Sequence, residues 1–82
     1  MKIPRDVRGE HLAKLLGKYD YVATRQTGSH LRLTRSAVED HHITIPKHKT
    51  LKIGTLNSII KDVGENLGKS KEELLNDLFG KE

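Results

Sequence analysis

The spacing of apolar residues changes twice along this chain, and the change restricts the folds that it can adopt. In residues 12–19 and again in residues 56–67, apolar residues recur every three or four positions, which is the repeat of one helix face. Between residues 21 and 46 they alternate with polar residues, which is the repeat of a strand with one buried face. The chain is therefore predicted to be α+β, with strands between two helices.

Three helices are predicted. The first covers about residues 9–18, and its apolar face carries Leu12, Leu15, Leu16 and Tyr19. The second opens at Gly54 and Thr55, and its apolar face carries Leu56, Ile59, Ile60, Val63 and Leu67. Ser70 with Glu73 three residues later is a capping box, which predicts a third helix bearing Leu74, Leu75, Leu78 and Phe79.

Three short strands are predicted between the helices. A hairpin follows Tyr21, and a third strand covers residues 42–45 and stops at Pro46, which has no N–H to donate. We expect a three-stranded antiparallel sheet with the helices on one face, and with its other face open to water. The core face is then formed by Val22, Leu31, Leu33, Ile43 and Ile45. The open face carries His30, Arg32, Thr34, His42 and Thr44.

The hairpin register decides which side chains lie beside His30. Residues 26–29 contain Gly28 and form the turn. A two-residue loop, Thr27-Gly28, would pair Arg25 with His30, because residues directly opposite on antiparallel strands share a face. A three-residue loop would instead place Gln26 opposite His30. In either register the imidazole is expected at the exposed end of a hairpin, among polar side chains.

Length and composition exclude several classes of protein. A chain of 82 residues is expected to form one domain, residues 1–82, with a small core. Because it contains no Cys, disulfides and thiolate zinc sites are excluded. It shows neither the apolar stretch of a membrane span nor that of a signal peptide. We therefore expect a cytoplasmic protein that does not bind membranes.

Positive charge is concentrated in the middle of the chain. The net charge is +4, but it is unevenly distributed. Residues 21–61 contain seven basic residues (Lys and Arg) and two acidic ones, whereas residues 62–82 contain three basic and six acidic residues. Four of the five His also lie in this middle block. This distribution predicts a surface for a polyanion such as RNA. The alternative is a solvated surface with uneven charge.

Histidine among arginines is suited to RNA cleavage without a metal. Imidazole can accept and donate protons near neutral pH. His30, beside Arg25 and Arg32, could remove the 2′-hydroxyl proton so that this oxygen attacks the adjacent phosphorus, while a cation stabilises the developing charge. The alternative is an ordinary surface His on a basic strand.

Other residues have weaker claims to a functional role. Lys47, Lys49 and Lys52 precede the second helix, where they either contact phosphates or form a solvated basic loop. The adjacent His41 and His42 point to opposite faces of a strand, so we expect no zinc site. His42 either reaches the open face as a second proton-handling group or is a simple surface His. Tyr21 either packs in the core or stacks on a base.

Five segments carry a family pattern. They are Gly9-Glu10-His11-Leu12 with Leu15-Leu16, Arg25-Gln26-Thr27-Gly28-Ser29-His30, His42-Ile43-Thr44-Ile45-Pro46, Leu51-Lys52-Ile53-Gly54-Thr55-Leu56, and Ile59-Ile60-Lys61-Asp62-Val63. In this order and spacing they resemble the HicA family, the toxins of HicA–HicB type II toxin–antitoxin pairs. The resemblance covers about residues 3–64 and leaves residues 65–82 as a C-terminal helical extension.

The resemblance implies a double-stranded-RNA-binding-domain-like fold with an α-β-β-β-α core. It implies mRNA interferase activity, that is, an endoribonuclease that needs no cofactor or metal and uses one essential His. That His corresponds to His30, with Gly28 and Ser29 as the turn that supports it. The implied partners are mRNA and a HicB-like antitoxin that masks the His. The chain departs from the family in having no Gly within residues 46–49.

Two other functions are compatible with these residues. The same basic surface would serve a double-stranded-RNA-binding module without catalysis. A toxin homologue that has lost its activity would bind only its HicB-like partner.

Overall fold

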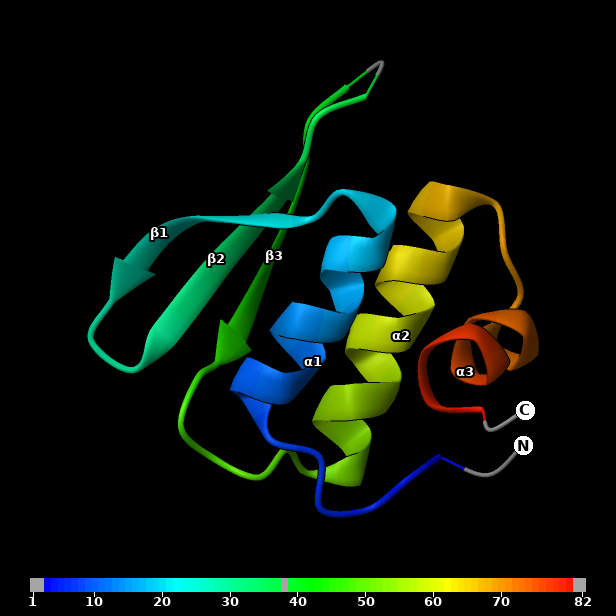
Figure 1. Cartoon of the computed structure of the whole chain (residues 1–82), viewed down its shortest axis with the longest axis horizontal. Helices are drawn as coiled ribbons and strands as arrows, with labels where there is room; N and C mark the ends of the chain where they lie inside the picture. The colour runs from blue at the N-terminus through cyan, green and yellow to red at the C-terminus, as the bar shows by residue number, and fades with distance from the viewer. Residues whose placement is uncertain (1–2, 38, 81–82) are drawn as a thin grey trace. The chain divides into compact units, whose positions relative to one another are not determined.

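The computed structural model describes residues 3–37 and 39–80, and it confirms an α+β fold with a three-stranded antiparallel sheet and three α-helices (Figure 1). The elements are α1 (Gly9–Leu16), a 3-10 turn (Gly17–Tyr19), β1 (Val22–Thr27), β2 (His30–Arg35), β3 (His41–Pro46), α2 (Ile53–Leu67) and α3 (Lys71–Phe79). The predicted order of helices and strands is therefore correct. The contacts within the chain define one compact unit, Asp6–Leu51, and a second unit formed by the described residues on either side of it.

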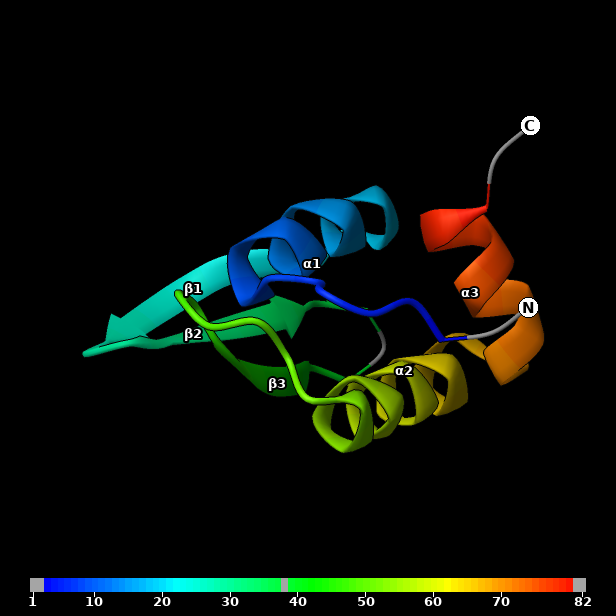
Figure 2. The same cartoon turned by 90° about the horizontal axis from the view of Figure 1, so that it is seen from below.

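The first unit contains α1 and the whole sheet, whose strand order is β1-β2-β3. Helix α1 lies along one face of the sheet and contacts β1 and β3 (Figure 2). Four of the five residues predicted for the core face are buried: Leu31, Leu33, Ile43 and Ile45. From α1, Leu12 and Leu16 are fully buried and Leu15 is half-buried, as is Tyr19 in the 3-10 turn that follows. Tyr21 is 2% exposed, so it packs in the core and cannot stack on a base.

Both registers considered for the hairpin are wrong. Thr27 pairs with His30 and Arg25 with Arg32, so the two-residue turn is Gly28-Ser29. Gly28 has a φ of 57°, and no other residue of the turn has a positive φ. This pattern is that of a type II′ turn, which takes Gly at its first central position. The predicted turn had Gly28 in the second position, which shifted the pairing by two residues.

Two further expectations are wrong, and a β-bulge in β1 explains the first of them. Between Ala23 and Arg25 the register shifts, so that Val22 pairs with Thr34 instead of Leu33. Val22 therefore faces away from the core and is 58% exposed. Thr34, expected in water, is only 6% exposed on the open face. The bulge adds one residue to one strand, and one residue is enough to turn a side chain to the other face.

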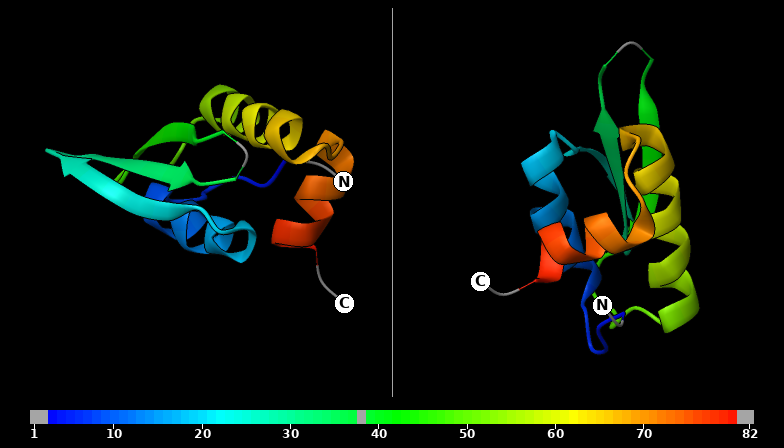
Figure 3. Two further views of the ribbon diagram at one scale, coloured as in Figure 1. Left: turned by 90° about the horizontal axis from the view of Figure 1, so that it is seen from above. Right: turned by 90° about the vertical axis from the view of Figure 1, so that its right-hand side faces the viewer.

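The second unit is built on α2 and α3. Helix α2 begins at Ile53, slightly before the predicted start, and buries Leu56, Ile59, Ile60 and Val63 as expected, with Leu67 half-buried. It ends at Gly68, which adopts the left-handed conformation (φ 70°). Helix α3 runs across the direction of α2 (Figure 3) and buries Leu74, Leu75 and Leu78. No helix in the described part of the chain is long and apolar enough to cross a bilayer.

The predicted capping box opens α3. The Ser70 hydroxyl accepts a hydrogen bond from the Glu73 N–H (3.1 Å), and the Glu73 carboxylate accepts one from the Ser70 N–H (2.9 Å). The hydrogen bond with the Ser70 backbone lowers the pKa of Glu73 below its ordinary value, and the hydrogen bond with the Ser70 side chain lowers it further, to a smaller extent. The charged form of Glu73 therefore favours the folded helix start.

We predict that this contribution disappears in acid. Because the pKa is lower in the folded than in the unfolded chain, the stabilisation is complete above the unfolded pKa and is lost as the pH falls through the folded pKa. Glu73→Gln can keep the same backbone hydrogen bond but does not titrate. Thermal unfolding between pH 7 and pH 3 should show a steeper loss of stability in the wild type than in Glu73→Gln. Parallel curves would contradict the assignment.

Candidate functional site

His30 is the first residue of β2 and directly follows the Gly28-Ser29 turn. It is exposed, and its neighbours across the sheet are Thr27 in β1 and Pro46 in β3. We call the side of the sheet that bears His30, opposite to the face covered by α1, the open face. By the alternation along each strand and the observed pairing it comprises Val22, Arg25, Thr27, His30, Arg32, Thr34, His42, Thr44 and Pro46.

The structure brings Arg25 and Arg32 together on this face. They are directly opposed across β1 and β2, a geometry that places the Cβ atoms about 5 Å apart. Arg32 is also the next residue after His30 on the same face of β2. Among residues 3–37 and 39–80, no carboxylate forms an ion pair with either guanidinium. The result is a concentrated, uncompensated positive charge beside an exposed imidazole.

The turn that carries His30 is attached to the chain beyond β3. The Lys47 N–H donates to the Ser29 carbonyl (2.6 Å), and the Lys47 ammonium donates to the Gln26 side-chain oxygen (3.2 Å). Gln26 pairs with Leu31, so it belongs to the α1 side of the sheet. The Lys47 charge is therefore held on the side opposite to the His30 imidazole.

The basic loop after β3 is hydrogen-bonded to the start of α1 (Figure 1). The Glu10 and Gly9 N–H groups donate to the Lys47 and Lys49 carbonyls (3.0 and 3.1 Å), and the Arg8 guanidinium donates to the His48 carbonyl (2.9 Å). These first amides of α1 are thus occupied by backbone oxygens. The Lys49 side chain remains exposed.

Lys52, the last of the predicted basic contacts, lies in the other unit. It is the N-cap residue of α2 and is exposed. The five predicted cationic residues therefore divide into three groups: Arg25 and Arg32 beside His30, Lys47 and Lys49 in the loop on α1, and Lys52 at α2.

The two adjacent histidines have different surroundings. His41 Nδ1 lies 2.6 Å from the Tyr21 hydroxyl, and the two rings meet edge to face. His42 Nδ1 lies 2.8 Å from the Thr34 hydroxyl on the open face. The prediction that they point to opposite sides is correct. Within the described ranges, no group of three or more His, Cys, Asp or Glu side chains is arranged to hold a metal ion.

His42 is too far from His30 for both imidazoles to act on the same phosphodiester bond. Thr34 pairs with His42, Arg32 with Thr44 and His30 with Pro46, so His42 is four residues along β3 from the position opposite His30. Four residues of a strand span about 13 Å. The expectation that His42 could act beside His30 as a second proton carrier is therefore wrong for a single phosphodiester.

Comparison with known proteins decides the family. A family model described as the HicA toxin of bacterial toxin–antitoxin systems matches residues 9–65. The chain belongs to the HicA toxin family. The matched region begins with α1 and contains the entire sheet of this HicA protein, including His30, and most of α2. Searches of curated proteins and of solved structures found no match.

The structure explains the Gly at the start of the matched region. A Cβ at Gly9 would collide with the Pro46 carbonyl oxygen and approach the Ile45 side chain to 3.0 Å. Glycine at this position allows α1 to approach the end of β3, which bears the basic loop. This requirement comes from packing, because Gly9 does not have a positive φ.

We predict that Gly9→Ala lowers the free energy of unfolding by about 1–3 kcal/mol, the usual result of inserting a methyl group where backbone cannot yield. Urea unfolding would measure this loss. Gly17→Ala is the matched control, because Gly17 has a helical φ of −57° and open space around it. Equal effects of the two substitutions would show that the Gly9–Pro46 approach is unimportant.

Proposed function

We propose that this HicA toxin is a metal-independent endoribonuclease that cuts mRNA, with His30 as general acid or base. The observation that carries the proposal is the position of His30, exposed on the open face next to the opposed pair Arg25 and Arg32. Membership of a toxin family supports it. Alternation along β2 and the pairing with β1 place all three side chains on one surface.

The chemistry requires only an RNA strand and the residues of this face. His30 removes the proton from a ribose 2′-hydroxyl, and the oxygen forms a bond to the adjacent phosphorus. The bond from phosphorus to the 5′-oxygen breaks, and that oxygen takes a proton from the charged His30 through a water molecule. The products are a 2′,3′-cyclic phosphate and a 5′-hydroxyl. DNA lacks the 2′-hydroxyl and is therefore not a substrate.

Arg25 and Arg32 stabilise the negative charge that develops on the phosphoryl oxygens. A guanidinium suits this role because it is permanently charged and donates two parallel hydrogen bonds to phosphate oxygens. We assign this role to the arginines and not to Lys47, because the Lys47 ammonium is bound to Gln26 on the α1 side. The flanking RNA can use Lys47, Lys49 and Lys52 for weaker phosphate contacts.

The proposed partners follow from the same surface. A HicB-like antitoxin inhibits the toxin by covering the open face, and mRNA in the cytoplasm is the substrate. Charge complementarity favours an acidic antitoxin surface at this position.

We predict that His30→Ala reduces the cleavage rate of single-stranded mRNA by at least about 100-fold, the contribution of a general acid–base group. The assay uses antitoxin-free protein in excess EDTA, with products resolved on a gel and tested for 2′,3′-cyclic phosphate. His11→Ala is the matched control, because His11 is an exposed His on α1, which covers the other face. RNA carrying 2′-O-methyl groups should remain intact.

Equal cleavage by the wild type and His30→Ala would reject the role of His30. Loss of cleavage in EDTA would reject metal independence. Salt-dependent RNA binding without cleavage would favour the binding module. Tight binding of an antitoxin together with inertness toward RNA would favour the inactive homologue.

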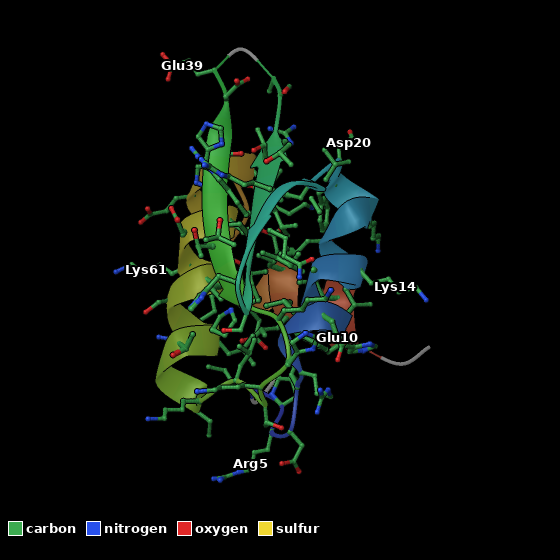
Figure 4. The ribbon with its side chains drawn as sticks, turned by 90° about the vertical axis from the view of Figure 1, so that its left-hand side faces the viewer. Arg5, Glu10, Lys14, Asp20, Glu39 and Lys61 are labelled. Carbon is green, nitrogen blue, oxygen red and sulfur yellow. The ribbon has the colours of Figure 1, made fainter. Side chains whose placement is uncertain are left out.

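We predict that Arg25→Gln and Arg32→Gln each increase the stability of the protein and decrease its cleavage activity. Each removes one of two like charges placed directly opposite, so each should raise the free energy of unfolding by about 0.2–1 kcal/mol. Each should also lower cleavage and reduce its dependence on salt. Lys14→Gln is the control, because this exposed cation points from α1 away from the sheet (Figure 4). Lower stability together with full activity would contradict the prediction.

A further inference from the structure

The bulge in β1 directs a hydroxyl onto the open face. In a regular ladder that pairs Arg25 with Arg32, the side chain of Thr24 would point with Leu33 into the core. The register shift between Ala23 and Arg25 instead leaves Thr24 as the extra residue. Its hydroxyl lies 2.8 Å from the Thr34 hydroxyl and donates to the Arg32 carbonyl at 3.4 Å. Bulges that redirect a side chain are common beside functional sites.

Thr34 is a buried hydroxyl in a position where an apolar residue would suffice. It is 6% exposed, and valine has the same shape without the hydroxyl. Burying a hydroxyl is unfavourable unless hydrogen bonds satisfy it. The Thr34 hydroxyl has two partners, Thr24 from β1 and His42 from β3. A hydrogen-bonded row therefore crosses all three strands and ends at an exposed imidazole.

This row orients the His42 ring. Nδ1 is held 2.8 Å from Thr34, so Nε2, on the far side of the ring, points away from Thr34. Among residues 3–37 and 39–80, Nε2 has no hydrogen-bonding partner. Because the Thr24 hydroxyl donates to the Arg32 carbonyl, the Thr34 hydroxyl donates to Thr24 and accepts from the His42 Nδ1–H. The charged ring then presents its second N–H, on Nε2, as a donor.

The open face therefore has three positions in a line. His30 lies at the turn, the Arg25–Arg32 pair one step further, and His42 with Thr34 two steps further. Each step is two residues of a strand, about 6.7 Å. This step is comparable with the distance between successive phosphates of an extended RNA strand. Duplex RNA does not present successive phosphates of one strand in a straight line along a flat sheet.

We propose that His42 is a binding residue for single-stranded RNA, and that Thr34 and Thr24 are its positioning residues. The Nε2–H of the charged His42 ring donates to the phosphodiester about two nucleotides from the bond at His30, and the Arg25–Arg32 pair binds between them. This inference extends the proposed function by naming the form of the substrate, an extended single strand, and its second contact. It requires no chemical step at His42.

The test measures RNA binding in a His30→Ala background, so that it does not depend on cleavage. The probes are fluorescent single-stranded RNA hexamers and dinucleotides of mixed sequence, with anisotropy as the readout. His42→Ala should weaken hexamer binding by about tenfold, the effect of one hydrogen bond to a charged group, and leave dinucleotide binding unchanged. His11→Ala should change neither.

Thr34 tests the positioning role. Thr34→Val should weaken hexamer binding, and Thr34→Ser, which keeps the hydroxyl, should restore it. The ¹⁵N NMR signals of the His42 ring should show Nδ1 hydrogen-bonded in the free protein and the Nε2 signal shifted by the hexamer, with the Nδ1 bond lost in Thr34→Val. Thermal unfolding checks that each variant is folded, and the His42→Ala result stands if Thr34→Val is not.

Unchanged hexamer binding by His42→Ala would overturn the inference. An equal loss for hexamer and dinucleotide would also overturn it, and so would a preference for duplex over single-stranded RNA. If the protein with His30 intact cleaves no RNA but hexamer binding still depends on His42, the proposed function fails and this inference stands. If cleavage occurs but His42→Ala has no effect on hexamer binding, the proposed function stands and this inference fails.

Discussion

The pairing of β1 with β2 is the constraint on which this site depends. Side chains alternate between the faces of a sheet, so the register decides which residues share a surface with His30. The Gly28-Ser29 turn sets that register at one end, because Gly28 adopts a φ of 57° that other residues avoid. The bulge at Thr24 changes it at the other end. Between them, Arg25 and Arg32 are brought opposite each other.

The open face contains two features that do not favour the stability of the sheet. Two opposed arginines repel each other, and a buried Thr34 hydroxyl must be satisfied, so neither feature helps the sheet to form. The rest of the Asp6–Leu51 unit supports them through its core, with Leu33 and Ile45 buried beneath the same strands. An anion bound at the arginines would relieve the repulsion, so the surface is better suited to a complex than to the free protein.

The end of the sheet that bears His30 is held by hydrogen bonds between distant parts of the chain. Residues of the loop after β3 bind both the turn before β2 and the first amides of α1. Gly9 allows this approach because it has no side chain. The backbone of His30 is thus held in place by contacts with residues far away in the sequence.

Local patterns were sufficient to predict the order of the elements, the apolar faces of the helices and the capping box at Ser70. They were also sufficient to place His30 on the open face. The predicted register differed from the observed one by two residues near the turn, and a shift of an even number leaves every side chain on the same face. With the two-residue loop, Arg25 was therefore placed correctly on the face of His30, although the residue opposite His30 was wrong. Val22 was misplaced because the bulge shifts the register by an odd number.

Amino-acid sequence alone determined what depends on neighbours within a few positions: helical and strand repeats, the Gly-containing turn, and the concentration of positive charge in residues 21–61. Only the tertiary structure decided that Arg25 lies directly opposite Arg32, where Lys47 directs its charge, and that Thr24 and Thr34 orient His42. These facts depend on the bulge and on contacts between residues far apart in the chain. Such contacts produce no periodic pattern in the sequence, because they arise when complete helices and strands pack together.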